Sequence, residues 1–204
     1  MHDIVPRWEF RVFGQDFGEP LAALRGLVSR EAVDSSQETY LVPHNIHDRN
    51  FKVRNGRLDV KALLDTVNGL ERWKPTLNEA LPLSRDWLCH ELLPLMGHPE
   101  VALVDDHSGL AQLAEAFRHA PGVGVVRVSK RRQRFTVEGC PVEHDDILVN
   151  GAAIRSMAVE SEDPEAVLRV IGRLGLDGRE NVDYPRALRR ILGFEPWPGD
   201  RDDG

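Results

Sequence analysis

The sequence predicts an α+β fold in which helices are inserted between groups of strands of one large, meandering antiparallel sheet. Three observations predict it. Several segments alternate apolar and polar residues with the two-residue period of a half-buried strand. Asn55-Gly56 joins two such segments and is the strongest short-range hairpin signal. The helical segments separate groups of strands, and this order does not fit the strict alternation of a parallel βαβ sheet.

The N-terminal part begins with a predicted strand over 7–13, where Trp8, Phe10 and Val12 alternate with charged residues. A helix is predicted over 18–32, because Pro20 stands near its start and leucines follow at helical spacing. A second strand is predicted over 37–42, and Pro43 ends it.

The segment Asn50–Lys61 is predicted to be a hairpin with a two-residue turn. In this register three pairs face one another on the polar side: Arg54 with Arg57, Lys52 with Asp59, and Asn50 with Lys61. The core-facing side carries Phe51, Val53, Leu58 and Val60. The cations on the polar side are either ordinary solvated surface or part of a site for an anion.

The region 69–121 is predicted to be a helical insertion, with one short strand over 71–77. Its first helix covers 84–97, with Ser84 as the N-cap and Gly97 at the end. Its second helix covers 108–119, with Ser108 as the cap.

Strands return over 125–139, 145–151 and 156–162. Asp163-Pro164 then starts a helix with proline at its first position, and a last helix covers 183–194. The expected organisation is a single domain over 1–195 followed by a flexible tail over 196–204.

The composition narrows the classes of function. The 204 residues carry a formal net charge of −7, which argues against a general binder of nucleic acid or membrane surfaces. Two cysteines, far apart in the sequence, form no disulfide framework. No stretch resembles a signal peptide or a membrane span, so a cytoplasmic location is expected. The sequence leaves the oligomeric state open, including a homodimer.

Charge is sorted among the predicted strands. Cations gather in the hairpin and in Ser129–Arg134, whereas Glu160 and Glu162 share one face of another strand. For one strand alone a solvated face is the more common explanation. If the sheet curls, these faces form a cationic lumen suited to a polyphosphate. Glu160 and Glu162 would then share Mg²⁺ or Mn²⁺, which prefer oxygen ligands and would activate a water.

These same residues resemble the CYTH or triphosphate tunnel metalloenzyme superfamily. Its first-strand ExExK signature resembles Arg7–Arg11, in which Glu9 and Arg11 match. Its LRxR motif and the lysine that follows resemble Lys52, Arg54 and Lys61. Its KxRxxY motif resembles Lys130, Arg132 and Phe135. Its later acidic motif resembles Asp146, Asn150-Gly151, Glu160 and Glu162, and its closing segment resembles 181–193. The resemblance spans most of the chain in order, and 69–121 matches only loosely.

The resemblance implies an eight-stranded antiparallel tunnel that binds triphosphate with a divalent metal. The residues implied to bind phosphate are Arg11, Lys52, Arg54, Lys61, Lys130, Arg132 and Arg134. The residues implied to hold Mg²⁺ or Mn²⁺ are Glu9, Glu160, Glu162 and Asp146. A turn at Arg131-Arg132 is an alternative, and it would place Arg127 and Arg134 in the lumen in place of Lys130 and Arg132.

Arg7 departs from the signature, because it replaces the first acidic residue and so removes a metal ligand. The leading hypothesis is a metal-dependent phosphohydrolase for a triphosphate or polyphosphate compound, with a metal-activated water as nucleophile. The first alternative is a non-catalytic tunnel that binds a polyanion or a phosphorylated metabolite. A class IV-like adenylate cyclase is a weaker alternative, because no adenine pocket is evident in the sequence.

Overall fold

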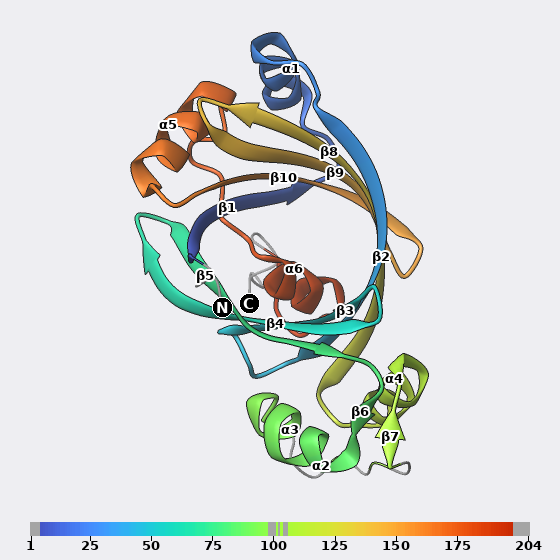
Figure 1. Cartoon of the computed structure of the whole chain (residues 1–204). Helices are drawn as coiled ribbons and strands as arrows, with labels where there is room; N and C mark the ends of the chain where they lie inside the picture. The colour runs from blue at the N-terminus through green and yellow to red at the C-terminus, as the bar shows by residue number, and fades with distance from the viewer. Residues whose placement is uncertain (1–4, 98–100, 102, 104–105, 198–204) are drawn as a thin grey trace, which may run out of the picture. The chain divides into compact units, whose positions relative to one another are not determined.

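The computed structural model describes residues 5–97, 101, 103 and 106–197. Eight strands form a closed antiparallel barrel in the order β1-β10-β9-β8-β2-β3-β4-β5 (Figure 1). They are β1 (Arg7–Gly14), β2 (Ala32–Pro43), β3 (Arg49–Arg54), β4 (Arg57–Val67), β5 (Leu70–Ala80), β8 (Val123–Val137), β9 (Cys140–Val149) and β10 (Ala152–Ser161). The predicted α+β class and the eight-stranded tunnel are confirmed.

The chain divides into two compact units, and the boundary runs through β2, β4, β5 and β8. The first unit comprises 1–37, 62–75 and 127–183, and the second comprises 38–61, 76–126 and 184–204. Each unit has its own hydrophobic core.

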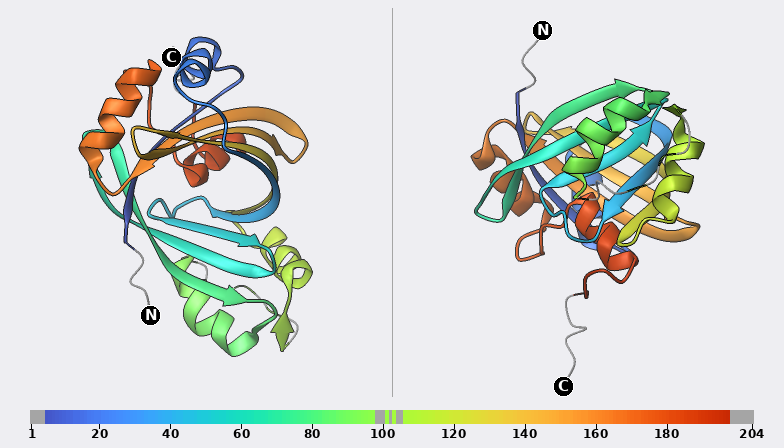
Figure 2. Two further views of the ribbon diagram at one scale, coloured as in Figure 1. Left: turned by 45° about the horizontal axis from the view of Figure 1, so that its top comes forward. Right: turned by 90° about the horizontal axis from the view of Figure 1, so that it is seen from below.

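In the first unit, helices α1 (Gly18–Leu27) and α5 (Pro164–Leu174) cover one face of the sheet formed by β1, β10, β9 and β8 (Figure 2). Alternating apolar residues on the strands, such as Phe10, Phe135 and Val159, pack against α5. Asp163 caps α5 by accepting a hydrogen bond from the backbone N–H of Glu165. The opposite face of these strands is therefore the one that looks into the barrel.

The second unit contains the predicted hairpin. Asn55 and Gly56 adopt φ angles of 52° and 67°, as a two-residue turn with left-handed positions requires. Phe51, Val53, Leu58 and Val60 are buried in the core of this unit. The predicted hairpin and its buried face are confirmed.

Short elements complete the second unit. They are β6 (Leu83–Ser84), α2 (Arg85–Trp87), η1 (Leu88–Leu92), α3 (Leu93–Leu95), β7 (His107–Ser108), α4 (Leu110–Arg118) and α6 (Tyr184–Ile191). Ser84 caps the first helical segment, because its hydroxyl accepts a hydrogen bond from the N–H of Trp87 at 3.2 Å. No helix in the described ranges is both long enough and apolar enough to cross a bilayer.

Two sequence predictions about elements are wrong, and one alternative is excluded. The segment 70–80 is a full barrel strand, β5, so the insertion begins after it. Ser108 lies in β7, and Gly109 occupies the N-cap position of α4. The alternative turn at Arg131-Arg132 does not form, because β8 continues to Val137 and pairs with β9 throughout. Of the predicted tail, residues 198–204 lie outside the described part of the chain.

Candidate functional site

Two neighbouring rows of directly opposed residues cross β8, β9 and β10 in the first unit. One row consists of Arg132, Asp145 and Ser156. The next row consists of Arg131, Asp146 and Arg155. Successive side chains of a strand point to opposite faces, so the two rows lie on opposite sides of the sheet. We call these sides the Arg11 face, which carries the first row and Arg11 of β1, and the Arg131 face, which carries the second row and the helices.

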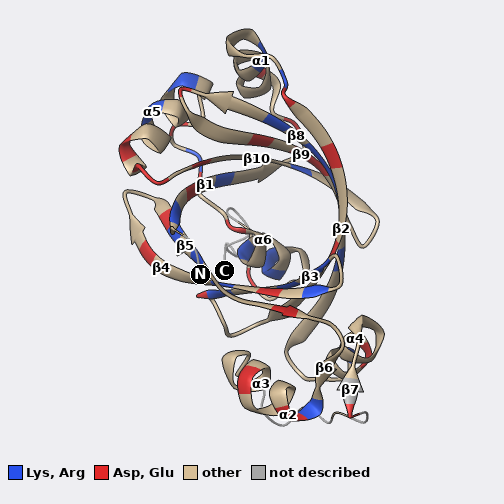
Figure 3. Ribbon diagram, viewed as in Figure 1, with Lys and Arg blue, Asp and Glu red and all other residues tan. Residues whose placement is uncertain are grey.

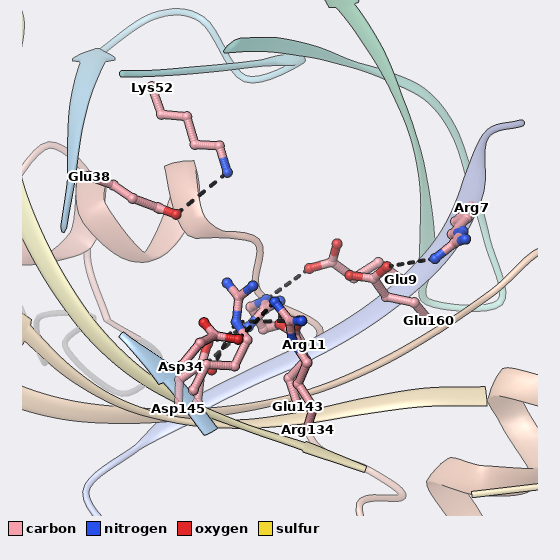
Figure 4. Close-up of polar contacts among 12 residues, drawn as sticks. Arg7, Glu9, Arg11, Asp34, Glu38, Lys52, Arg134, Glu143, Asp145 and Glu160 are labelled. Carbon is pink, nitrogen blue, oxygen red and sulfur yellow. Dashed lines mark hydrogen bonds and ion pairs between the residues drawn. The ribbon is translucent and has the colours of Figure 1, made fainter. Parts of the chain in front are cut away.

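Arg11 lies at the centre of a polar cluster on the Arg11 face (Figure 4). Its Nε donates a hydrogen bond to Glu9 at 2.8 Å, and its Nη1 donates one to the hydroxyl of Ser156 at 3.0 Å. The same guanidinium forms ion pairs with Asp145 at 3.5 Å and with Glu143 at 3.4 Å. Three carboxylates and one hydroxyl therefore surround one arginine.

Arg132 joins the Arg11 cluster from β8. Its Nε lies 3.3 Å from Glu143 and 3.5 Å from Asp145. Glu143 and Asp145 thus contact two guanidinium groups each. Arg11 is only 4% exposed and Asp145 is fully buried, and charges this deep are stable only when they are paired and hydrogen-bonded. Removing one partner would leave a buried charge uncompensated.

A row of three glutamates crosses the neighbouring strands on the same face. Glu9 of β1 lies directly opposite Glu160 of β10 on one side and Glu71 of β5 on the other. Directly opposed like charges repel unless cations lie between them. Here Arg11 contacts Glu9, and Arg7 lies 3.8 Å from Glu160. Glu71 is buried and accepts a hydrogen bond from the indole N–H of Trp73 at 3.1 Å.

The glutamate row fits a divalent metal by donor chemistry, because carboxylate oxygens are the ligands that Mg²⁺ and Mn²⁺ prefer. Its arrangement is different from a formed site. Among the described residues, no three His, Cys, Asp or Glu side chains are placed to hold an ion together. Arginine contacts occupy Glu9 and Glu160 instead. An ion would bind here only if these contacts were exchanged.

The other predicted cations of the first unit lie on the Arg11 face as well. Lys130 is buried and two residues before Arg132, and Arg134 is two residues after it on the same uninterrupted strand. Arg134 is half exposed and forms an ion pair with Asp34 at 2.9 Å. The register thus places Lys130, Arg132 and Arg134 on one face and Arg127 on the other.

The second unit holds another charged cluster, which is built on β2 and β3. Glu38 is buried and lies 3.8 Å from Lys52 and 3.6 Å from Arg54. Glu38 also accepts a hydrogen bond from the hydroxyl of Tyr40 at 2.7 Å. Burial lowers the pKa of Lys52, and the adjacent Arg54 and Lys61 lower it further, while Glu38 opposes the shift. Figure 4 shows Lys52 directed at Glu38.

Two predicted metal ligands do not join the glutamate row. Asp146 lies on the Arg131 face, where it pairs with Arg131 and Arg155, so the expected grouping of Asp146 with Glu9 does not form. Glu162 follows the last residue of β10. Within the described ranges no hydrogen bond or ion pair reaches its carboxylate.

The sequence reasoning missed Glu143, Asp145, Ser156, Glu71 and Glu38, all of which belong to these clusters. One signal was available for the first two. Glu143 and Asp145 alternate with His144 and Asp146 in a single strand, so one of the two pairs had to face the barrel interior. Positive and negative side chains are accordingly mixed along β1 and β8 to β10 (Figure 3).

Comparison with protein-family profiles gives no match, and comparison with curated protein sequences gives none either. The structure is similar to a candidate adenylyl cyclase from Hippeastrum that shows a dominant triphosphatase activity. The TM-score is 0.52 at 14% identity, over 96% of this chain and 100% of that one. It is also similar to a conserved hypothetical protein from Pyrococcus furiosus, with TM-score 0.47, 17% identity and coverage of 87% and 96%.

A candidate adenylate cyclase from Bacillus halodurans gives a TM-score of 0.47 at 10% identity, over 89% of this chain and 97% of that one. At these TM-scores the Pyrococcus and Bacillus proteins add nothing to the assignment. The Hippeastrum protein supports the fold alone, because its identity to this chain is low. The chain has a CYTH-like tunnel fold.

Proposed function

We propose that this protein binds a triphosphate or polyphosphate compound on the Arg11 face and hydrolyses a phosphoanhydride bond when Mg²⁺ or Mn²⁺ is bound. One observation carries the proposal: two guanidinium groups, those of Arg11 and Arg132, are gathered inside a barrel against carboxylates that suit a divalent ion. Arginine binds phosphate oxygens in bidentate geometry, and its bonds to anions are among the strongest in proteins.

The ion pairs of the Arg11 cluster support an exchange of partners on binding. A triphosphate would offer oxygens to Arg11 and Arg132 in place of Glu9, Glu143 and Asp145. The released carboxylates would repel the phosphate unless a cation neutralised them. Polyanion and divalent ion should therefore bind together, and each should bind only weakly alone.

Glu9, Glu71 and Glu160 are the residues that would hold the ion, and Glu162 remains a predicted further ligand. When bound, a divalent ion supplies neutralisation of phosphate charge and a water of lowered pKa. The groups of the chain itself do the positioning. Arg11 and Arg132 orient the phosphates, and the Ser156 hydroxyl holds the Arg11 guanidinium in place at 3.0 Å.

Burial of this cluster favours catalysis by preorganised charge. Arg11 and Arg132 are largely shielded from solvent, at 5% and 13% side-chain exposure. Their charges therefore act on phosphate oxygens with less screening than in water. Lys130, Arg134, Lys52, Arg54 and Lys61 are proposed to contribute further phosphate contacts.

A non-catalytic polyanion-binding tunnel is the second candidate, and a specific contact favours it. Arg7 replaces an acidic residue of the family signature and pairs with Glu160, a proposed metal ligand, at 3.8 Å. A protein with Glu160 permanently neutralised would still bind phosphates through Arg11 and Arg132. It would bind metal too weakly to hydrolyse them.

The experiment that separates the two candidates is phosphate release from tripolyphosphate with Mg²⁺ or Mn²⁺, combined with calorimetric binding of tripolyphosphate. For a hydrolase, Glu9→Gln and Glu160→Gln should reduce turnover by orders of magnitude and leave the circular dichroism spectrum unchanged. Asp146→Asn is the matched control, because this carboxylate lies on the opposite face. Binding without turnover in the wild type would establish the non-catalytic candidate, and absence of both would overturn the proposal.

A further inference from the structure

A cavity of about 620 Å³ lies in the first unit, and its lining residues Arg131, Asp146 and Arg155 have no part in the proposed function. Its lining includes Gln37, Ser129, Arg131, Asp146, Leu148 and Arg155. A volume of this size is typical of sites for small organic molecules. Three charged lining residues, Arg131, Asp146 and Arg155, belong to the Arg131 face and point away from Arg11 and Arg132, whereas Lys130, which also lines the cavity, lies on the Arg11 face.

The cavity wall consists of a charged row next to an apolar one. Arg131, Asp146 and Arg155 form the charged row across β8, β9 and β10. The neighbouring row on the same face consists of Ser129, Leu148 and Ala153, with Leu148 in the middle. Leu148 is 47% exposed, so its side chain offers apolar surface to the cavity. One small molecule could therefore contact the charged row and the apolar row at the same time.

Asp146 holds both arginines in place. Its Oδ1 accepts a hydrogen bond from the Nε of Arg155 at 3.1 Å, and its Oδ2 lies 3.5 Å from the Nη1 of Arg131. Arg155 is also fixed by the backbone carbonyl of Gln15 at 2.9 Å and by Asp16 at 3.6 Å. Arg155 is therefore committed to partners within the chain.

Arg131 makes fewer polar contacts than Arg155. Across the described ranges its one polar partner is Asp146, reached through Nη1, so the edge formed by Nε and Nη2 carries no contact there. The side chain is 57% exposed. This edge presents two parallel N–H groups, which match the two oxygens of a carboxylate. The hydroxyl of Ser129, two residues earlier on the same face, makes no side-chain hydrogen bond within the described part of the chain.

We propose that this cavity is a second binding site, for a small organic monocarboxylate with an apolar body. The carboxylate binds the free edge of Arg131, and the apolar body lies over Leu148 and Ala153. A single negative charge suits the site better than a phosphate, because Asp146 and Asp16 already balance the two arginines. The inference is independent of the activity proposed for the Arg11 face.

The test is a titration with 4-phenylbutyrate at millimolar concentration, followed by calorimetry and by backbone amide shifts in two-dimensional NMR. Acetate serves as the charged head alone, and 4-phenylbutanol as the apolar body alone. The amides of Ser129, Arg131 and Leu148 should shift with 4-phenylbutyrate and much less with either fragment. Arg131→Gln should weaken binding about tenfold, the loss expected for a charged bidentate contact.

Two further variants distinguish a specific contact with Arg131 from a general effect of charge. Arg127→Gln is the matched control, because Arg127 lies on the same strand and the same face and does not line the cavity. It should leave binding unchanged. Asp146→Asn should tighten binding a few-fold, since it removes a competing negative charge beside Arg131. No binding of 4-phenylbutyrate, equal loss in Arg127→Gln, or insensitivity to Arg131→Gln would overturn the proposal.

Discussion

Arg7 is the residue at which the first strand differs from the ExExK signature that it resembles, and its replacement gives the sharpest test of the proposed metal site. Arg7 lies 3.8 Å from Glu160, which is itself directly opposite Glu9. Arg7→Gln removes the positive charge and keeps the size of the side chain similar. We expect Mn²⁺ binding to become tighter, because the Glu160 carboxylate no longer has a cation of the chain to neutralise it.

The size of the effect follows from the geometry of the pair. Two unit charges at this separation interact by about 1 kcal/mol in a water-like dielectric. The Arg7 side chain is 53% exposed, which places the pair among exposed ion pairs, for which measured values are about 0.2–1 kcal/mol. The upper value corresponds to an affinity gain of about fivefold. Arg7→Glu should gain more, since it also adds a carboxylate two residues before Glu9.

The assay is calorimetric titration of Mn²⁺ in the presence of tripolyphosphate, alongside phosphate release, for wild type, Arg7→Gln and Arg7→Glu. Arg72→Gln is a suitable control, because Arg72 pairs with Asp65 and not with the glutamate row. Tight Mn²⁺ binding by the wild type, combined with loss of activity in both Arg7 variants, would refute the reasoning. It would make Arg7 a working part of the site.

Two pH dependences follow from buried groups. Burial lowers the pKa of Lys52 below its usual 10.5, so tripolyphosphate affinity should begin to fall at a pH below 10.5. Lys52→Arg should abolish that fall. If the variant and the wild type lose affinity equally as the pH rises, Lys52 is not part of the site. Burial also lowers the pKa of His144 below 6.5. The unfolded chain then takes up this proton first as pH falls through 6.5, so the free energy of unfolding decreases, by at most about 1.4 kcal/mol per pH unit. Urea unfolding of wild type and His144→Gln at pH 7 and pH 5 measures this, and equal losses in the two proteins would contradict it.

Much of the fold could be predicted because several strands and turns have a recognisable pattern in their own short segment of sequence. The alternation around Phe10 and the Asn55-Gly56 turn each specify one element without knowledge of the others. Strand β5 was predicted too short, because Pro75 and the charged residues around it obscure the alternation. Its partners in the barrel are distant in sequence, and only pairing with them extends the strand.

The site could be predicted only in part, because a face is set by the register between strands and not by one strand alone. In Glu143–Asp146 every residue is polar, so the sequence gives no apolar side from which to read direction. Pairing with β8 decides that Asp145 joins Arg132 and that Asp146 joins Arg131. A shift of one residue would reverse both assignments.

The central claim is that the phosphate compound binds on the Arg11 face. Arg131 and Arg132 are adjacent in sequence and lie on opposite faces, so they form a matched pair of variants. We expect Arg132→Gln to weaken tripolyphosphate binding about tenfold by calorimetry, and Arg131→Gln to leave it unchanged. Equal loss in both variants, or loss only in Arg131→Gln, would contradict the account.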